Sequence, residues 1–168
     1  MKVKLKKEYL QTVQLSWKCI EPMLLAVRGK DYPIKIEMYQ QLNEGQQGLY
    51  MFYSFHIRTN STAEFYWFAN YYITKVQSWS GIKRAVEFYS DNEMVVLLDA
   101  IELFIQKCNQ ANNSGGNVSP SDLKADRVLN NEVKVLFDKY RVQSENTIDL
   151  MNKWIINHEE DFIEINSY

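Results

Sequence analysis

The residues best suited to nucleophilic or metal chemistry are few in this chain. Histidine and cysteine occur twice each, as His56, His158, Cys19 and Cys108. A zinc site needs several such ligands at close spacing, and a carboxylate-bridged metal pair in a helical bundle needs Glu-x-x-His on two helices. Neither spacing occurs here, and neither does a glycine-rich phosphate-binding loop. The sequence therefore predicts no metal, no cofactor and no nucleotide bound through these motifs.

Two single residues remain as chemical candidates. His56 falls on the apolar stripe of an expected helix, where a lone histidine is usually a hydrogen-bonded core residue. Glu64 follows Ser61 by three residues, the form of a capping box, so capping is its expected role. A Glu64 buried against tyrosine and tryptophan could instead transfer protons. In that alternative the chain is a small-molecule-binding protein or an enzyme with an aromatic pocket lined by Tyr53, His56, Glu64 and Trp67.

Aromatic residues are concentrated in an expected helix over residues 62–78. One stripe of this helix consists of Phe65, Phe68, Tyr72, Val76 and Trp79, and Tyr66, Trp67, Tyr71 and Ile73 occupy much of the rest. A helix that is apolar nearly all round is buried in a core or meets a partner on its outer face. We expect mainly core, with a protein interface that includes Trp67 and Tyr71 as the second interpretation. Asn70 is either a satisfied buried amide or a polar contact to a partner.

Charge argues against several classes of function. The net charge of −2 and the pI of about 5.7 argue against a general nucleic-acid-binding protein. Residues 61–74 contain no lysine or arginine to hold phosphates beside the aromatic rings. Residues 1–30 do hold seven basic and two acidic side chains, and the run Lys2, Lys4, Lys6 and Lys7 could touch an acidic partner or phosphates. A solvated helix start or a frayed terminus is the plainer interpretation of that run.

The spacing of apolar residues indicates the scaffold that must position these candidates. The 168 residues suffice for one compact domain, and their hydrophobic content of 46% is close to that of globular proteins. Apolar positions recur every three or four residues through most of the chain. We therefore expect an all-α, single-domain bundle of about seven to nine helices over residues 1–168. The expected helical segments are 10–24 with an end or kink at Pro22, one from Pro33 to about 42, 49–57, 62–78, 82–89, 92–110, 120–141 and 144–155.

Residues 109–119, which are rich in asparagine, serine and glycine, are expected to form a flexible loop inside the domain with nothing buried in it. Ser119, Pro120 and Asp122 then have the order of a helix start. Asn130 and Asn131 are a possible interruption, and a last helix restarts near residue 144. A C-terminal helical hairpin after the loop fits this pattern.

The chain shows no segment of the length and apolar character that a membrane span needs, and its basic start lacks the uninterrupted apolar run of a signal peptide. The two cysteines are far apart in the sequence and are expected to be reduced. The cytoplasm is therefore the expected location.

The order of residues between positions 63 and 104 is similar to that of a known protein family. The segment consists of the run Ala63–Tyr72, then Trp79, then Ala85–Phe88 and finally Met94–Phe104. This segment resembles a widespread family of small all-helical bacterial proteins, mostly of unknown function, that includes a DNA-mimic protein. The family pattern has a Gly-Gly-Phe, whereas here Glu64 stands where glycine is usual. The resemblance implies a helical fold, but not the mimic function, because a duplex mimic needs a dense array of acids.

The leading hypothesis is thus a cytoplasmic bacterial helical protein without enzymatic activity, acting as a protein–protein interaction or regulatory module. A homodimer is one form of this contact. The pocket around His56 and Glu64 is the alternative, and the candidate interface or pocket residues are Tyr53, His56, Glu64, Trp67, Asn70 and Tyr71. Nucleic acid and membrane are not expected as partners.

Overall fold

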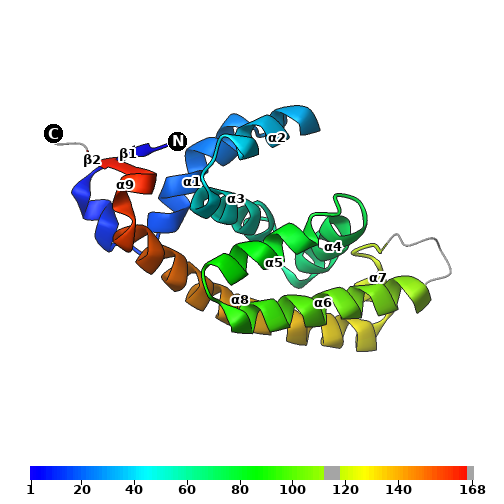
Figure 1. Ribbon diagram of the computed structural model, residues 1–168. Coiled ribbons are helices and arrows are strands. Elements are labelled where there is room, and N and C mark those ends of the chain that lie inside the picture. The colour runs from blue at the N-terminus through cyan, green and yellow to red at the C-terminus, as the bar shows by residue number, and fades with distance from the viewer. Residues whose placement is uncertain (112–117, 166–168) are drawn as a thin grey trace.

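The computed structural model describes residues 1–111 and 118–165 (Figure 1). Two strands, β1 (Val3–Leu5) and β2 (Ile163–Ile165), lie near the two ends of the chain, and a 3-10 helix spans Lys7–Gln11. The α-helices in the described part are α1 (Leu15–Ala26), α2 (Tyr32–Gln40), α3 (Glu44–His56), α4 (Thr62–Thr74), α5 (Trp79–Phe88), α6 (Asn92–Ala111), α7 (Asp122–Ala125), α8 (Arg127–Asn157) and α9 (Glu159–Phe162). The all-α class and the expected number of helices are confirmed for these residues.

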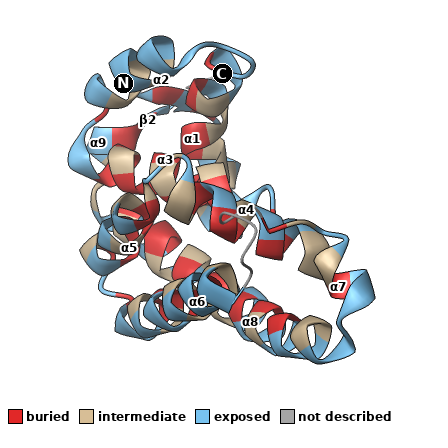
Figure 2. Ribbon diagram, turned by 90° about the vertical axis from the view of Figure 1, so that its right-hand side faces the viewer, coloured by how far each residue is buried: buried red, intermediate tan, exposed pale blue. Residues whose placement is uncertain are grey.

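Helix α8 runs along the length of the molecule and organises the other helices (Figure 1). Helices α4, α6 and α7 pack against its amino-terminal part, and α1 and α9 pack near its carboxyl end. Helix α3 packs between α1 and α5, and α2 lies outermost on α3. The buried residues lie on the helix faces that turn toward one another (Figure 2). Their hydrophobic side chains form one contiguous cluster.

Aromatic rings make up the centre of this cluster. The ring of Phe55 on α3 lies 5.1–5.6 Å, centroid to centroid, from the rings of Trp79, Tyr140 and Tyr72. Phe65 on α4 joins the same group, 5.5 Å from Tyr140. Edge-on and tilted pairs of this kind add to the free energy of burial. The expectation that the aromatic helix belongs mainly to the core is therefore confirmed for its inner stripe.

The predicted C-terminal hairpin is wrong. Residues 127–157 form the single helix α8, and neither the asparagine pair near its start nor the polar segment at Ser144 interrupts it. Ser144 and Thr147 are buried, and their hydroxyls donate to Arg141 O (2.7 Å) and Asp91 Oδ2 (2.6 Å). The bond from Ser144 stays within α8, whereas the bond from Thr147 is a tertiary contact to the turn before α6. Both satisfy polar side chains that favour a helix boundary in an isolated segment.

The amino-terminal segment also differs from its prediction. The first α-helix begins at Leu15, about five residues late, and continues through Pro22. The preceding residues include β1, which pairs in parallel with β2 in the register Val3↔Ile163 and Leu5↔Ile165. Three-residue strands are too short to show the alternating pattern by which a strand is recognised. The sheet was therefore not expected.

The helix boundaries are predicted unevenly: α4 and α6 begin at the expected residues, whereas α3 begins at Glu44, five residues before its expected start. Asn43 and Gln46 form a reciprocal capping box on α3, and Ser61 Oγ caps α4 by accepting from Glu64 N at 3.2 Å. Helix α4 ends at Thr74, four residues early, before Gln77 with its φ of 54°. Helix α6 extends to residue 111, so the first three residues of the predicted loop are helical. Residues 112–117 lie outside the described residues, and Val118 is buried, contrary to expectation.

Candidate functional site

The six candidate residues do not meet in one site. Tyr53 and His56 on α3 point into a polar network in the core, and Glu64 lies exposed at the start of α4. Asn70 is buried between α4 and α6. Trp67 and Tyr71 are on the outside of α4. The aromatic pocket of the alternative hypothesis, in which His56 and Glu64 would share one cavity, is therefore not formed by these residues.

The Tyr53 and His56 network joins three helices. Tyr53 OH shares a hydrogen bond of 2.8 Å with Ser16 Oγ of α1, and His56 Nδ1 lies 3.2 Å from Tyr140 OH of α8. The His56 ring also stacks on Phe52, with centroids 5.1 Å apart. Burial raises the pKa of Tyr53 to about 12 and lowers the pKa of His56 to about 4. At neutral pH both groups are thus uncharged and act as structural hydrogen-bonding groups.

Acid is expected to weaken the fold through His56. Its pKa falls from 6.5 to about 4 on folding, so between these pH values the unfolded chain binds a proton that the folded chain does not. The contribution of His56 to stability is complete above about pH 6.5 and is lost as the pH falls to about 4. We expect a loss of about 2 kcal/mol in the free energy of unfolding, since the ring is only partly buried.

Urea unfolding of the wild type and of His56→Gln at pH 7 and pH 4.5 measures this loss. The glutamine keeps a polar group near Tyr140 but does not titrate. A variant with the same pH dependence as the wild type would show that His56 is not the group responsible.

Glu64 has a local role. Its Oε2 accepts from Asn60 N at 3.0 Å, whereas the predicted box would have it accept from the cap residue Ser61. Its side chain is exposed, so the buried acid of the alternative hypothesis is wrong. Asn70 is a paired buried amide, because its Oδ1 accepts from Asn109 Nδ2 at 2.8 Å.

Trp67 and Tyr71 form an exposed aromatic pair. Their rings are nearly parallel, with an interplanar angle of 12° and centroids 5.4 Å apart, and the residues keep 37% and 39% of their surface exposed. Glu64 and Lys75 continue the same stripe of the helix at its two ends, and both are exposed. We call these four residues the outer face of α4. Phe68 flanks it, in edge contact with Trp67 and beneath the guanidinium of Arg58, 5.3 Å from the ring centroid.

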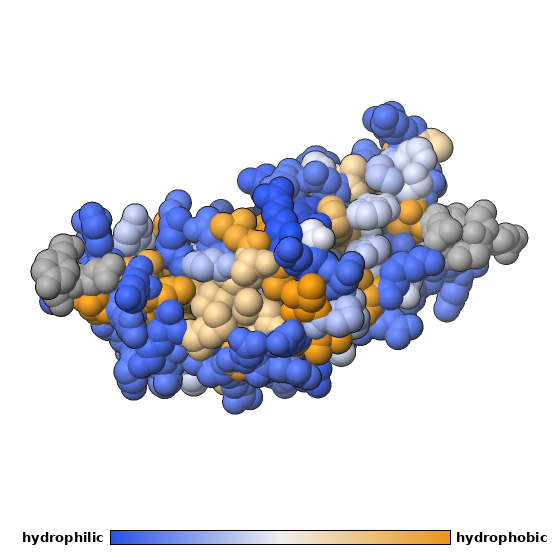
Figure 3. Space-filling view, turned by 90° about the horizontal axis from the view of Figure 1, so that it is seen from above, coloured by the Kyte–Doolittle hydropathy of each residue, from blue (hydrophilic) through white to orange (hydrophobic). Residues whose placement is uncertain are grey.

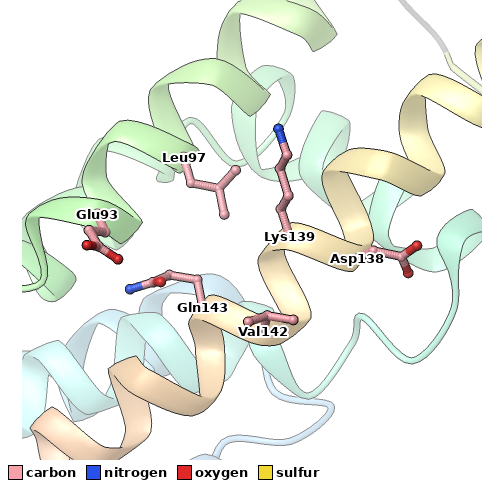
Figure 4. A pocket seen from close by; sticks show the side chains of 6 residues that line it. All are labelled: Glu93, Leu97, Asp138, Lys139, Val142 and Gln143. Carbon is pink, nitrogen blue, oxygen red and sulfur yellow. The ribbon is translucent and has the colours of Figure 1, made fainter.

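Two hollows of the described surface lie away from all six candidates. The first, of about 510 Å³, is a shallow groove between α6 and α8 lined by Glu93, Leu97, Asp138, Lys139, Val142 and Gln143 (Figure 4). Its two carboxylates lie on different helices and point apart, and Asp138 pairs with Lys134 at 2.8 Å. This groove therefore lacks a converging set of acid, base or nucleophile. The second hollow, of about 380 Å³, lies beside β1.

The described residues contain no group of three or more histidine, cysteine, aspartate or glutamate side chains placed to hold a metal ion. Within the same residues, each helix is too short or too polar to cross a membrane. Comparison with protein-family models, with curated proteins and with solved structures finds no match. The resemblance of residues 61–104 to the helical bacterial family stays a prediction.

The sequence identified Trp67 and Tyr71 as candidates, but the prediction missed that they lie on one face of the helix between two opposite charges. The signal was present, since residues 64, 67, 71 and 75 are spaced by three and four positions with an acid at one end and a base at the other. The hollow beside β1 had no such signal, because its walls come from elements that only the tertiary fold brings together.

Proposed function

We propose that this chain is a cytoplasmic protein that acts by protein–protein contact rather than by catalysis, and that the outer face of α4 binds the same face of a second copy. The observation that carries the proposal is the exposed, stacked pair of Trp67 and Tyr71. Tryptophan and tyrosine are the residues on which interfaces most often depend, because they bury a large area at low cost in conformational entropy. Free thiols at Cys19 and Cys108 fit a reducing compartment.

The outer face of α4 is complementary to itself. In a pair whose two-fold axis is perpendicular to α4, the two copies of the helix run antiparallel, so the start of one helix lies opposite the end of the other. Glu64 of one copy then meets Lys75 of its partner, and Trp67 meets Tyr71. The aromatic pair lies midway between the two charges, which are about 16 Å apart along the helix at 1.5 Å per residue. Both the charge pattern and the apolar centre therefore match in this arrangement.

The interior of the molecule supports binding over catalysis. Tyr53, His56 and Tyr140 are uncharged at neutral pH, and their polar atoms are paired within the core, Tyr53 with Ser16 and His56 with Tyr140. The groove between α6 and α8 brings no acid and base together (Figure 4). The outer face of α4 is in contrast accessible, apolar at its centre and charged only at its ends.

The test is the mass in solution, measured by light scattering on a sizing column over a concentration series. The wild type is expected to dimerise, and the double variant Trp67→Ala/Tyr71→Ala is expected to weaken the dimer at least 30-fold, about 2 kcal/mol. Tyr32→Ala is the matched control, because Tyr32 is an aromatic residue with 62% exposure on another helix. A wild type that stays monomeric at 500 µM, or a dimer that the double variant leaves intact, would overturn the proposal.

A charge exchange tests the antiparallel geometry. Glu64→Lys and Lys75→Glu are each expected to weaken the dimer several-fold by placing like charges together, and the combination is expected to restore most of the affinity. Thermal melting of each variant separates a loss of association from a loss of fold, since Glu64 also accepts the amide of Asn60. Failure of the combined variant to recover would exclude this register.

A further inference from the structure

The second hollow follows the free side of β1. It is lined by the five consecutive residues 1–5 and, across from them, by a side of α1 that includes Lys18, Glu21 and Met23, together with Met38 of α2. Its lining contains no residue of β2, the strand with which β1 pairs. The hollow therefore lies on the side of β1 away from its partner strand, with α1 as the opposite wall.

The hollow exposes the edge of β1 rather than one face. Successive side chains of a strand point to opposite faces, so a hollow over one face would touch alternate residues only. Here buried Val3 and Leu5 and exposed Lys2 and Lys4 all contribute to the lining. Beyond the pairing with β2, residues 2–5 make no backbone hydrogen bond to another described residue. An edge of this kind presents N–H and C=O groups that a further strand can pair with.

The edge is held in place for such pairing. The side-chain amide of Gln46 on α3 donates to the carbonyl of Met1, which fixes the start of β1 against the helices. Gln46 itself is fully buried, so this contact is part of the core. A preformed edge reduces the entropy lost when a peptide binds.

The chemistry of the groove selects an acidic segment. Its floor is apolar, with Met23 buried beneath it and Met38 beside it, and apolar side chains gather over α1 and α2 in the middle of this side of the molecule (Figure 3). Lys2 and Lys4 are exposed along the strand and form no ion pair with another described residue. Of the nearby acids, Glu21 pairs with Lys18 at 2.8 Å. Glu164 of β2 lies beside Lys4 in the sheet register but forms no ion pair with it, and Lys2 has no acid opposite it in the described pairing.

We propose that an extended, acidic segment of a partner protein binds between β1 and α1 by adding a third strand to the sheet. The backbone of the segment pairs with the free edge of β1, and its side chains alternate. One set is apolar and enters the groove toward Met23, and the other is acidic and meets Lys2 and Lys4. Five residues of strand span about 16 Å, so a segment of five to seven residues fits the edge. This site is independent of the dimer through α4.

The probe is a fluorescent peptide of seven alternating valine and glutamate residues, blocked at both ends, titrated with the full chain at low salt and read by anisotropy. Binding is expected to weaken at least 10-fold with Lys2→Glu/Lys4→Glu. The double variant Lys107→Glu/Lys153→Glu is the matched control, because it makes the same charge change at exposed positions on α6 and α8 and is expected to leave binding within two-fold.

Two modified peptides separate strand addition from simple charge attraction. N-methylation of alternate backbone nitrogens removes the donors that pair with β1 and is expected to weaken binding at least 10-fold, while lysine in place of glutamate is expected to abolish it. The proposal would be overturned if the parent peptide did not bind, or if the methylated peptide bound equally well. It would also be overturned if heparin competed with the peptide in a way that depends on Lys2 and Lys4, while methylation of the peptide backbone had no effect. The last result would assign these lysines to polyanions in general.

Discussion

Asp91→Ala is expected to lower the free energy of unfolding by about 3 kcal/mol, one of the two largest effects foreseen for a single substitution. Asp91 is buried at the turn between α5 and α6, with 3% of its surface exposed. Its Oδ1 accepts from Met94 N at 2.9 Å, which caps α6, and from Gln143 Nε2 at 2.8 Å. Its Oδ2 accepts from Thr147 Oγ1 at 2.6 Å. One carboxylate thus joins the start of α6 to the middle of α8.

The size of this effect has two sources. Loss of a helix cap costs about 1 kcal/mol, and a buried donor left without a partner costs about 1–3 kcal/mol. Met94 is fully buried, so water cannot replace the acceptor that its N–H loses, and Gln143 Nε2 loses its partner as well. The Thr147 hydroxyl keeps the carbonyl of Gln143, at 3.0 Å, as an acceptor. Asp91→Asn is expected to lie between the wild type and alanine, because it keeps one acceptor oxygen.

Urea unfolding at pH 7 measures both variants of Asp91. Asp99→Ala is the control, since this exposed acid on α6 only pairs with Lys83 and is expected to cost less than about 1 kcal/mol. A loss at Asp91 no larger than at Asp99 would mean that the turn and α8 are not joined through this carboxylate.

Gly45→Ala is expected to destabilise the protein by about 2 kcal/mol, although alanine normally stabilises a helix by about 0.5–1 kcal/mol over glycine. A Cβ at residue 45 would lie 2.6 Å from Cζ of Phe162. Phe162 is fully buried where α9 leads into β2, so its ring cannot move without displacing that strand. The same substitution therefore also loosens the pairing of β2 with β1.

Gly81→Ala is the matched control. A Cβ there would lie 2.8 Å from Cε of Met51, the far end of a flexible side chain that can turn away. We expect this variant to equal or exceed the wild type in stability. Thermal and urea unfolding compare the two variants, and an equal effect of both would contradict the role assigned to Phe162.

Features that depend on neighbours in sequence were predictable. The apolar stripe of residues 92–110 gave α6 almost to the residue, and Pro33 and Ser61 marked the starts of α2 and α4. Periodicity and capping are properties of one or two helical turns, so they can be recognised without knowledge of the fold.

The candidate site was predictable only in part. The sequence singled out Trp67 and Tyr71 as interface candidates and His56 as a core histidine, and the structure gives them accessible and partly buried positions respectively. The sequence did not decide whether Glu64 is exposed or is buried in a pocket with His56. That choice depends on how α3 and α4 pack, because an all-round aromatic helix has no polar stripe to show which side faces water.

The sequence by itself determined the helical class, the starts of α2, α4 and α6, and the aromatic composition of the core, since these follow from spacing and local hydrogen bonds. Only the tertiary structure decided that α8 is unbroken, that β1 and β2 pair, and which side of α4 is exposed. Each of these depends on contacts between residues distant in the chain, such as Thr147 with Asp91, 56 positions apart, or Ser16 with Asn152, 136 positions apart. Such contacts satisfy polar groups or pair backbone edges that, in a local segment, would favour a turn or solvent.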